Sequence, residues 1–276
     1  MTTTTRPGAG PGAGCGTSSP GGEVVDGAPG QGGVRPCAPG TRCCTFAVVR
    51  RWECFSVTGV VTGVNGSSAS EASRAPLFVK ICGLRTAEDV DAAVEAGADA
   101  IGFVFAPGGP RTVDPALARP LAERVPGHVL TVGVFRGQPV AEVRALARAA
   151  GVRAVQLHGD EGPAHYAELR PDGWTLIRAT SCHGEPPALG ELGEDLLLLD
   201  APAPGSGEPW DWSAGSFTPP AGRWILAGGL HPGNVADAVR TTRPWGVDVS
   251  SGVEARRGVK DPRLIREFLR AARSVE

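Results

Sequence analysis

Residues 77–105 read LFVKICGLRTAEDVDAAVEAGADAIGFVF, and this stretch contains one strand–helix–strand unit. The apolar runs Leu77–Cys82 and Ala100–Phe105 have the length and the β-branched content of buried strands. Between them, Thr86–Ala96 has apolar residues at helical spacing, and Thr86 stands where an N-cap is expected. The stretch therefore predicts two parallel strands, because the helix between them returns the chain to the same end of a sheet.

The same alternation continues to the end of the chain. Further runs of strand length are Leu130–Phe135, Ala154–His158, Thr175–Ala179, Leu196–Asp200, Trp224–Ala227 and Gly246–Ser250. Segments with helical spacing lie between most of them, at Asp114–Arg124, Val140–Ala150, Pro163–Leu169, Pro232–Thr241 and Asp261–Arg273. Two linking segments, Gly184–Gly193 and Ser213–Gly222, are expected to be weak helices because Gly and Pro interrupt them.

Eight such repeats in about 200 residues predict an α/β fold of the (β/α)8 TIM-barrel type. A doubly wound open sheet is the alternative, but it more usually carries a Gly-rich turn after its first strand, and here that turn contains Gly83 alone. In a TIM barrel the catalytic groups stand at the C-terminal ends of the strands. The polar residues that end each apolar run are therefore the candidates for function.

Residues 1–76 differ in composition from the rest of the chain. The first forty residues contain 12 Gly and 6 Pro, a content that does not support regular structure. We therefore predict a disordered, low-complexity extension over residues 1–76 and a catalytic barrel over residues 77–276. Met1 is the only methionine, so a second hypothesis is that translation starts at a later Val or Leu codon and that the extension is not made.

Charge and cysteine content narrow the class of protein. Lys and Arg total 27 against 29 for Asp and Glu, so neither nucleic acid nor an acidic membrane is expected as a partner. No run of about 18 uncharged apolar residues occurs, which excludes a membrane span. Residues 1–20 lack an apolar signal-peptide core and the cysteine count is odd, so a cytoplasmic protein with reduced thiols is expected. No cysteine or histidine spacing indicates a metal site.

Polar side chains end several of the predicted strands. Because strand side chains alternate, three pairs should share an inward face: Lys80 with Cys82, Gln156 with His158, and Asp248 with Ser250. Asp200 ends a run of four leucines, and Arg111 lies in the long second loop. Polar groups at successive inward positions are costly unless they are paired or hydrated, so we expect them to form a site.

Two loops have the character of a phosphate site. Gly228 and Gly229 follow the seventh strand, and Ser250, Ser251 and Gly252 follow the eighth. Barrels often bind phosphate between these loops through backbone N–H groups and a helix N-terminus. Glycines after a strand also make tight turns, and that interpretation stays open.

Cys82 and Asp200 are the candidates for proton transfer. A cysteine at the end of a strand is more often a small buried apolar residue, but an ammonium at Lys80 would favour the thiolate that a base must be. Asp200 can serve as a general acid if burial raises its pKa enough to hold the proton that such an acid donates. The first and sixth strands lie on different sides of a barrel, so acid and base would face a substrate from opposite sides.

Seven motifs in order resemble those of phosphoribosylanthranilate isomerase of tryptophan biosynthesis: Lys80–Leu84, Gly102–Phe105, the Arg111 loop, Val155–Gly159, Leu198–Asp200, Ala227–Leu230 and Asp248–Glu254. The resemblance runs from Leu77 to about Ala272 and leaves the extension unaccounted for. It implies a cofactor-free Amadori rearrangement of N-(5-phosphoribosyl)anthranilate, a small phosphosugar, to 1-(2-carboxyphenylamino)-1-deoxyribulose 5-phosphate. It also implies that Asp200 protonates the furanose oxygen, that Cys82 removes the C2 proton, and that Arg111 binds the anthranilate carboxylate.

One loop departs from the family pattern. Members commonly carry a glycine-rich loop after the acid, here represented by Gly205 and Gly207, but Pro204 replaces the first glycine and Glu208 adds a negative charge. Two other functions remain open: another phosphosugar isomerase or epimerase barrel, and a non-catalytic phosphosugar-binding barrel. Neither accounts for Cys82, Asp200 and Arg111 together. A monomer or a homodimer is expected.

A buried ion pair is predicted beneath the thiol. If the barrel closes, the first and eighth strands are neighbours, and inward-facing Lys80 and Asp248 can each offset the desolvation of the other. The alternative is that Asp248 accepts a hydrogen bond from a loop amide.

Overall fold

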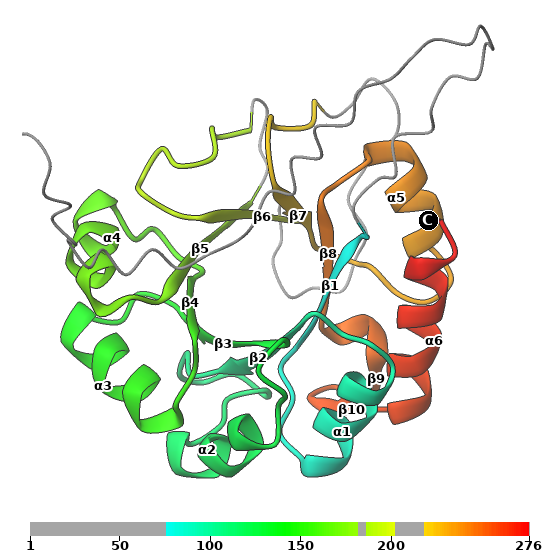
Figure 1. The fold of residues 1–276 in the computed structure, drawn as a ribbon, viewed down its shortest axis with the longest axis horizontal. Coiled ribbons are helices and arrows are strands. Elements are labelled where there is room, and N and C mark those ends of the chain that lie inside the picture. The colour runs from blue at the N-terminus through cyan, green and yellow to red at the C-terminus, as the bar shows by residue number, and fades with distance from the viewer. Residues whose placement is uncertain (1–75, 182–185, 202–217, 276) are drawn as a thin grey trace, which may run out of the picture. The chain divides into compact units, whose positions relative to one another are not determined.

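A computed structural model describes residues 76–181, 186–201 and 218–275. Parallel strands β1 to β8 close into a barrel in sequence order (Figure 1). Their bounds are β1 Phe78–Cys82, β2 Ala100–Val104, β3 Leu130–Phe135, β4 Ala154–Leu157, β5 Thr175–Ser181, β6 Leu196–Asp200, β7 Trp224–Leu226 and β8 Gly246–Val249. Each predicted strand is present within two residues at either end, and the closed ring confirms the barrel over the open sheet.

Helices surround this ring (Figure 1). They are α1 Ala87–Glu95, α2 Pro115–Glu123, α3 Val140–Ala150, α4 Pro163–Leu169, α5 Val235–Thr242 and α6 Pro262–Arg273, with 3-10 turns η1 Arg170–Asp172 and η2 Ser251–Val253. All six predicted helices are confirmed. The described parts of the two weak linkers, residues 186–193 and 218–222, hold no helix. Among the described residues, none of the helices has the length and apolar character needed to cross a membrane.

Side-chain caps fix where three of the helices begin. Thr86 Oγ1 accepts from Asp89 N at 3.2 Å before α1. Asp114 caps α2 through Ala116 N at 2.7 Å, and Asp261 caps α6 in the same way. Because each cap satisfies an otherwise unpaired amide, it sets the length of the loop that precedes the helix. These loops carry much of the rim of the barrel.

The barrel interior is packed below its C-terminal rim. Inward-facing apolar side chains form a cluster separate from the one between strands and helices: Cys82, Ala100, Val132, Val134, Ala154, Ile177, Ala179, Leu196, Leu198, Ile225 and Ala227. Outward neighbours such as Val79 and Ile81 join the larger cluster beneath the helices. The polar residues at the C-terminal ends of the strands therefore lie above a layer of packed apolar side chains.

The seam of the barrel lies between β1 and β8. Lys80 is in register with Asp248, and Phe78 with Gly246. A Cβ on Gly246 would lie 2.7 Å from the Phe78 carbonyl oxygen, so this position needs glycine. At the opposite end from the rim, Arg273 of α6 donates to Asp99 Oδ2 at 2.7 Å and also to the Leu77 carbonyl. The last helix thus holds the start of the first strand in place.

Candidate active site

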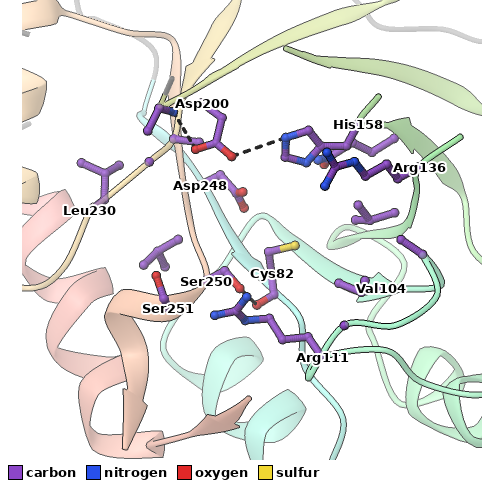
Figure 2. Close-up of a pocket in the computed structure, with 18 of the residues that line it drawn as sticks. Cys82, Val104, Arg111, Arg136, His158, Asp200, Leu230, Asp248, Ser250 and Ser251 are labelled. Carbon is purple, nitrogen blue, oxygen red and sulfur yellow. Dashed lines mark hydrogen bonds and ion pairs between the residues drawn. The ribbon is translucent and has the colours of Figure 1, made fainter. Parts of the chain in front are cut away.

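A cavity of about 220 Å³ opens at the C-terminal ends of the strands (Figure 2). Nine of the predicted site residues line it: Cys82, Arg111, Gln156, His158, Asp200, Gly228, Gly229, Ser250 and Ser251. Gly252 follows directly in the η2 turn. Gly205 and Gly207 lie outside the described residues, as do Pro204 and Glu208.

Cys82 lines the cavity at the end of β1, with 6% of its surface exposed. Its neighbour in register on β2 is Gly102, where a Cβ would lie 2.8 Å from the sulfur. Burial raises the pKa of the Cys82 thiol above its usual 9.0, even though Lys80 and Lys260 act to lower it. The expected influence of Lys80 on the thiolate is therefore present, but desolvation outweighs it.

Lys80 and Asp248 form the buried pair predicted beneath the thiol. Lys80 Nζ donates to Asp248 Oδ1 at 2.8 Å, and the Lys80 side chain is fully buried. Burial lowers the pKa of Lys80, but Asp248 and Cys82 more than offset this and hold the pKa above its usual 10.5. The lysine is thus a fixed positive charge under the site.

Asp200 ends β6 and faces the cavity with both oxygens in defined positions. Oδ1 accepts from Ala201 N at 2.7 Å, and Oδ2 lies 3.4 Å from His158 Nε2 (Figure 2). His158 follows β4, where its amide bonds to the Phe135 carbonyl. The nearby Gln156 Oε1 is buried and has no hydrogen-bond partner in the described residues. An unpaired buried acceptor is costly, so Gln156 Oε1 is available for a ligand donor.

Glycines bring the two phosphate-type loops together. Gly228 has φ +87°, and a Cβ there would lie 2.5 Å from Ala201 N and 2.8 Å from Asp200 Oδ1. A Cβ on Gly252 would lie 1.9 Å from the Leu230 carbonyl oxygen. Asn234, before α5, fixes the first loop by donating to the Gly229 carbonyl at 2.9 Å. The close approach of backbones at both loops favours their use as amide donors to an anion.

Arg111 is held by a partner that the sequence interpretation did not include. Its Nε and Nη2 donate to the two carboxylate oxygens of Glu254 at 2.6 and 3.1 Å. Glu254 also accepts from Lys260 Nζ at 3.0 Å and from Gly258 N at 2.9 Å. Burial acts to raise the pKa of Glu254, but these donors lower it to about 2. Arg111 is therefore held in place by the Glu254 carboxylate, which stays ionised at neutral pH.

Lys260 connects this arrangement to the end of the eighth strand. It lies in a two-stranded hairpin, β9 Glu254–Arg256 and β10 Val259–Lys260. Its ammonium donates to the Ser250 carbonyl at 2.7 Å and to Ser250 Oγ at 3.2 Å, while Ser250 Oγ contacts the Cys82 carbonyl at 3.2 Å. One charged network thus links Arg111, the phosphate-type loop and the strand that carries the thiol.

A family model for N-(5'-phosphoribosyl)anthranilate isomerase matches residues 79–271, which is most of the chain and nearly the whole barrel. The chain belongs to the phosphoribosylanthranilate isomerase family. Among its relatives, the N-(5'-phosphoribosyl)anthranilate isomerase of Chromohalobacter salexigens is 46% identical over 200 residues, covering 69% of this chain and 92% of that protein.

Solved structures of the phosphoribosylanthranilate isomerase family share the fold. TrpF from Jonesia denitrificans is 48% identical with a TM-score of 0.66, over 72% of this chain and 98% of that one. A second structure, of phosphoribosyl anthranilate isomerase in complex with reduced 1-(o-carboxyphenylamino)-1-deoxyribulose 5-phosphate, is 33% identical with a TM-score of 0.60, over 72% and 99% of the two chains.

Sequence interpretation missed three charged residues of this phosphoribosylanthranilate isomerase site. Arg136 lines the cavity just after β3, and its position two residues beyond inward-facing Val134 could have indicated it. Glu254 lay within a quoted motif but received no role. Lys260 gave no signal, because a two-residue strand has no readable periodicity.

Proposed function

We propose that this protein catalyses the Amadori rearrangement of N-(5-phosphoribosyl)anthranilate to 1-(2-carboxyphenylamino)-1-deoxyribulose 5-phosphate, a step of tryptophan biosynthesis in the cytoplasm. One observation carries the proposal: a thiol on β1 and a carboxyl on β6 line a single cavity whose rim holds two glycine-dependent loops. Family membership supplies the substrate, which the geometry alone does not name.

Asp200 is the proposed general acid. It gives its proton to the furanose ring oxygen, the C1–O bond breaks, and the anilino nitrogen shares its lone pair to form a protonated Schiff base. Asp200 Oδ1 accepts a hydrogen bond from the Ala201 amide. The transferable proton is therefore placed on the other oxygen, Oδ2, which is the one nearer His158. A carboxyl fixed by one backbone bond and one neighbouring ring is held in a single orientation, which general acid catalysis requires.

Cys82 is the proposed general base. Its thiolate removes the C2 proton of the Schiff base, the C2–H electron pair forms the C1=C2 double bond, and the C1=N π pair returns to nitrogen to give the enolamine. C1 then gains a proton and the C2 hydroxyl loses one, which gives the ketone product. Burial holds the pKa of the free thiol up, while Lys80 and Lys260 pull it down. The positive charge of the Schiff base adds to the two lysines, so the thiolate is favoured at the stage that needs it.

The rest of the cavity is proposed to position the substrate. Its phosphate would bind the amides of the Gly228–Gly229 and Ser250–Gly252 loops. Gln156 Oε1 would accept from a sugar hydroxyl, since it has no partner in the described part of the chain. Arg111 would bind the anthranilate carboxylate, a role that a planar guanidinium suits. The reaction as proposed needs no cofactor.

The test is the loss of anthranilate fluorescence from the substrate on conversion. Purified protein should consume the signal, and Cys82→Ser and Asp200→Asn should each lower kcat at least about 10²-fold, the scale of general acid–base catalysis. Glu123→Gln, on the exposed face of α2, is the matched control and should keep full activity. An unchanged signal would favour a binding protein, and turnover of other phosphosugars alone would favour another isomerase. Full activity of either variant would overturn its assigned role.

The boundary at residue 77 and the choice between monomer and homodimer stay predictions. Residues 1–75 lie outside the described residues.

A further inference from the structure

Arg136 is an arginine of the cavity that has no carboxylate partner. Two arginines line the described part of the cavity, Arg111 and Arg136. Arg111 is paired with Glu254 through two hydrogen bonds. The Arg136 guanidinium makes no hydrogen bond or ion pair with any described residue, and its side chain is exposed to the cavity. Figure 2 shows it directed into the cavity, as is the ring of His158, which follows the neighbouring strand β4.

The pairing of Arg111 limits what that residue can offer a substrate. Glu254 has a pKa of about 2, so it stays ionised at any working pH. It is held in turn by Lys260 and by the Gly258 amide, so it does not move aside for a ligand. Arg111 therefore keeps one edge, formed by Nη1 and the second N–H of Nη2, for another carboxylate, and Glu254 already balances its positive charge. Because Glu254 already offsets its charge, Arg111 attracts a second anion less strongly than an unpaired guanidinium would.

The position of Arg136 fits the end of the substrate away from the phosphate. In Figure 2 it lies on the β3–β4 side of the cavity, across from Ser251 and Leu230 on the loops after β7 and β8. The wall beside it is apolar, with Val104 and Val134. An aromatic ring against that wall would place its ring substituents near Arg136.

The backbone on either side of Arg136 is fixed. Buried Glu161 accepts from Gly137 N at 2.6 Å and from Gly159 N at 2.7 Å. One carboxylate thus clamps the residue after Arg136 to the residue after His158. A long side chain on a fixed backbone loses less freedom on binding than one on a loose loop.

We propose that Arg136 binds the carboxylate of the substrate's aromatic ring and shares it with Nη1 of Arg111. Arg136 supplies the uncompensated charge, and Arg111 supplies a fixed donor. The inference rests on the proposed function, since it names the residue that selects a carboxyl-bearing ring at the same site.

The test compares two ligands that differ by one group. The first is the reduced product, 1-(2-carboxyphenylamino)-1-deoxyribulose 5-phosphate after reduction, and the second has a plain phenyl ring. Calorimetry should show that the parent binds the first more tightly. Arg136→Met should reduce this preference about tenfold, the scale of one charge-assisted hydrogen bond, and leave affinity for the phenyl ligand unchanged. Arg136→Lys should restore part of the preference.

Turnover gives a second readout that a structural role would not reproduce. Arg136→Met should raise KM about tenfold and change kcat little, because the interaction exists before and after the chemical step. Arg119→Met is the charge-matched control, since Arg119 pairs with Glu123 on α2 at a distance from the cavity lining. It should leave both KM and the ligand preference as in the parent.

The possible results separate this inference from the proposed function. A parent that binds neither ligand contradicts both. A parent that prefers the carboxyl ligand, with an Arg136→Met variant that prefers it equally, overturns the inference and leaves the proposed function standing. Equal weakening of both ligands in Arg136→Met also overturns it, because that pattern indicates a general effect on the cavity.

Discussion

Substitution of Asp248 should lower the free energy of unfolding of the barrel, because it removes the ion-pair partner of a fully buried lysine. Lys80 Nζ lies 2.8 Å from Asp248 Oδ1, and the lysine side chain has no exposed surface. In Asp248→Ala the ammonium keeps its full desolvation cost and loses its counter-charge. Asp248→Asn is the matched variant, because its amide oxygen retains the acceptor at the same place while removing the charge.

The magnitude follows from the geometry of the pair. Breaking a buried pair by removing one partner costs about 3–5 kcal/mol. With a urea m-value of about 2 kcal/mol/M, the midpoint of unfolding should fall by about 2 M. Asp248→Asn should lose less than Asp248→Ala. Fluorescence-monitored urea unfolding of parent and both variants at neutral pH measures the difference.

The loss of stability in Asp248→Ala relative to the parent should also depend on pH, and its sign can be worked out. In the parent the folded pKa of Lys80 is raised above 10.5, so its contribution is present below that pH and is lost as pH rises through the folded pKa. In Asp248→Ala burial dominates and lowers the folded pKa of Lys80 below the unfolded one. The unfolded chain then binds a proton that the folded chain releases, so the stability of the variant rises with pH and its deficit narrows toward pH 10.

Equal urea midpoints for the parent and Asp248→Ala at neutral pH would refute the reasoning. A deficit that widens between pH 7 and pH 10 would also contradict it, because that trend would assign the loss to a group other than the lysine.

Two further predictions concern the rim. Glu254, with its pKa lowered to about 2 from 4.5, stabilises the fold above the unfolded pKa, and this contribution is lost as pH falls toward 2. In urea unfolding between pH 6 and pH 3, Glu254→Gln should therefore lose less stability than the parent; equal losses would contradict this. Gly252→Ala places a Cβ 1.9 Å from the Leu230 carbonyl oxygen and should weaken inhibition by inorganic phosphate at least about tenfold. Gly127→Ala, where nothing lies within 4 Å of the added carbon, should leave phosphate inhibition unchanged and serves as its control.

The barrel could be predicted from the sequence because each strand repeats the same local pattern. Leu130–Phe135 and Leu196–Asp200 have the predicted bounds, since apolar runs of this kind have clear ends. The helix expected from Pro232 begins instead at Val235. There His231 N donates to Asn234 Oδ1, and this local turn uses three residues before the helix can start.

The site was predictable where function coincides with a strand end, as at Cys82 and Asp200. The partner of Arg111 was not, because Glu254 reaches it across 143 positions of sequence and no local pattern encodes that contact. The balance between burial and the neighbouring lysines, which sets the pKa of Cys82, could not be predicted from the sequence either. A sequence shows that Lys80 is near the thiol, but it does not show how much water the fold removes from both.

The pairing of β1 with β8 at the seam affects how the chain folds during its synthesis. Ribosomal synthesis delivers Lys80 168 positions before Asp248. Until β8 emerges, the nascent sheet has two open edges, which can pair with other polypeptides. Closure of the barrel is thus a late event in folding. Substitutions at the seam are therefore expected to lower the yield of folded protein in a cell more than they lower the turnover of the molecules that have folded.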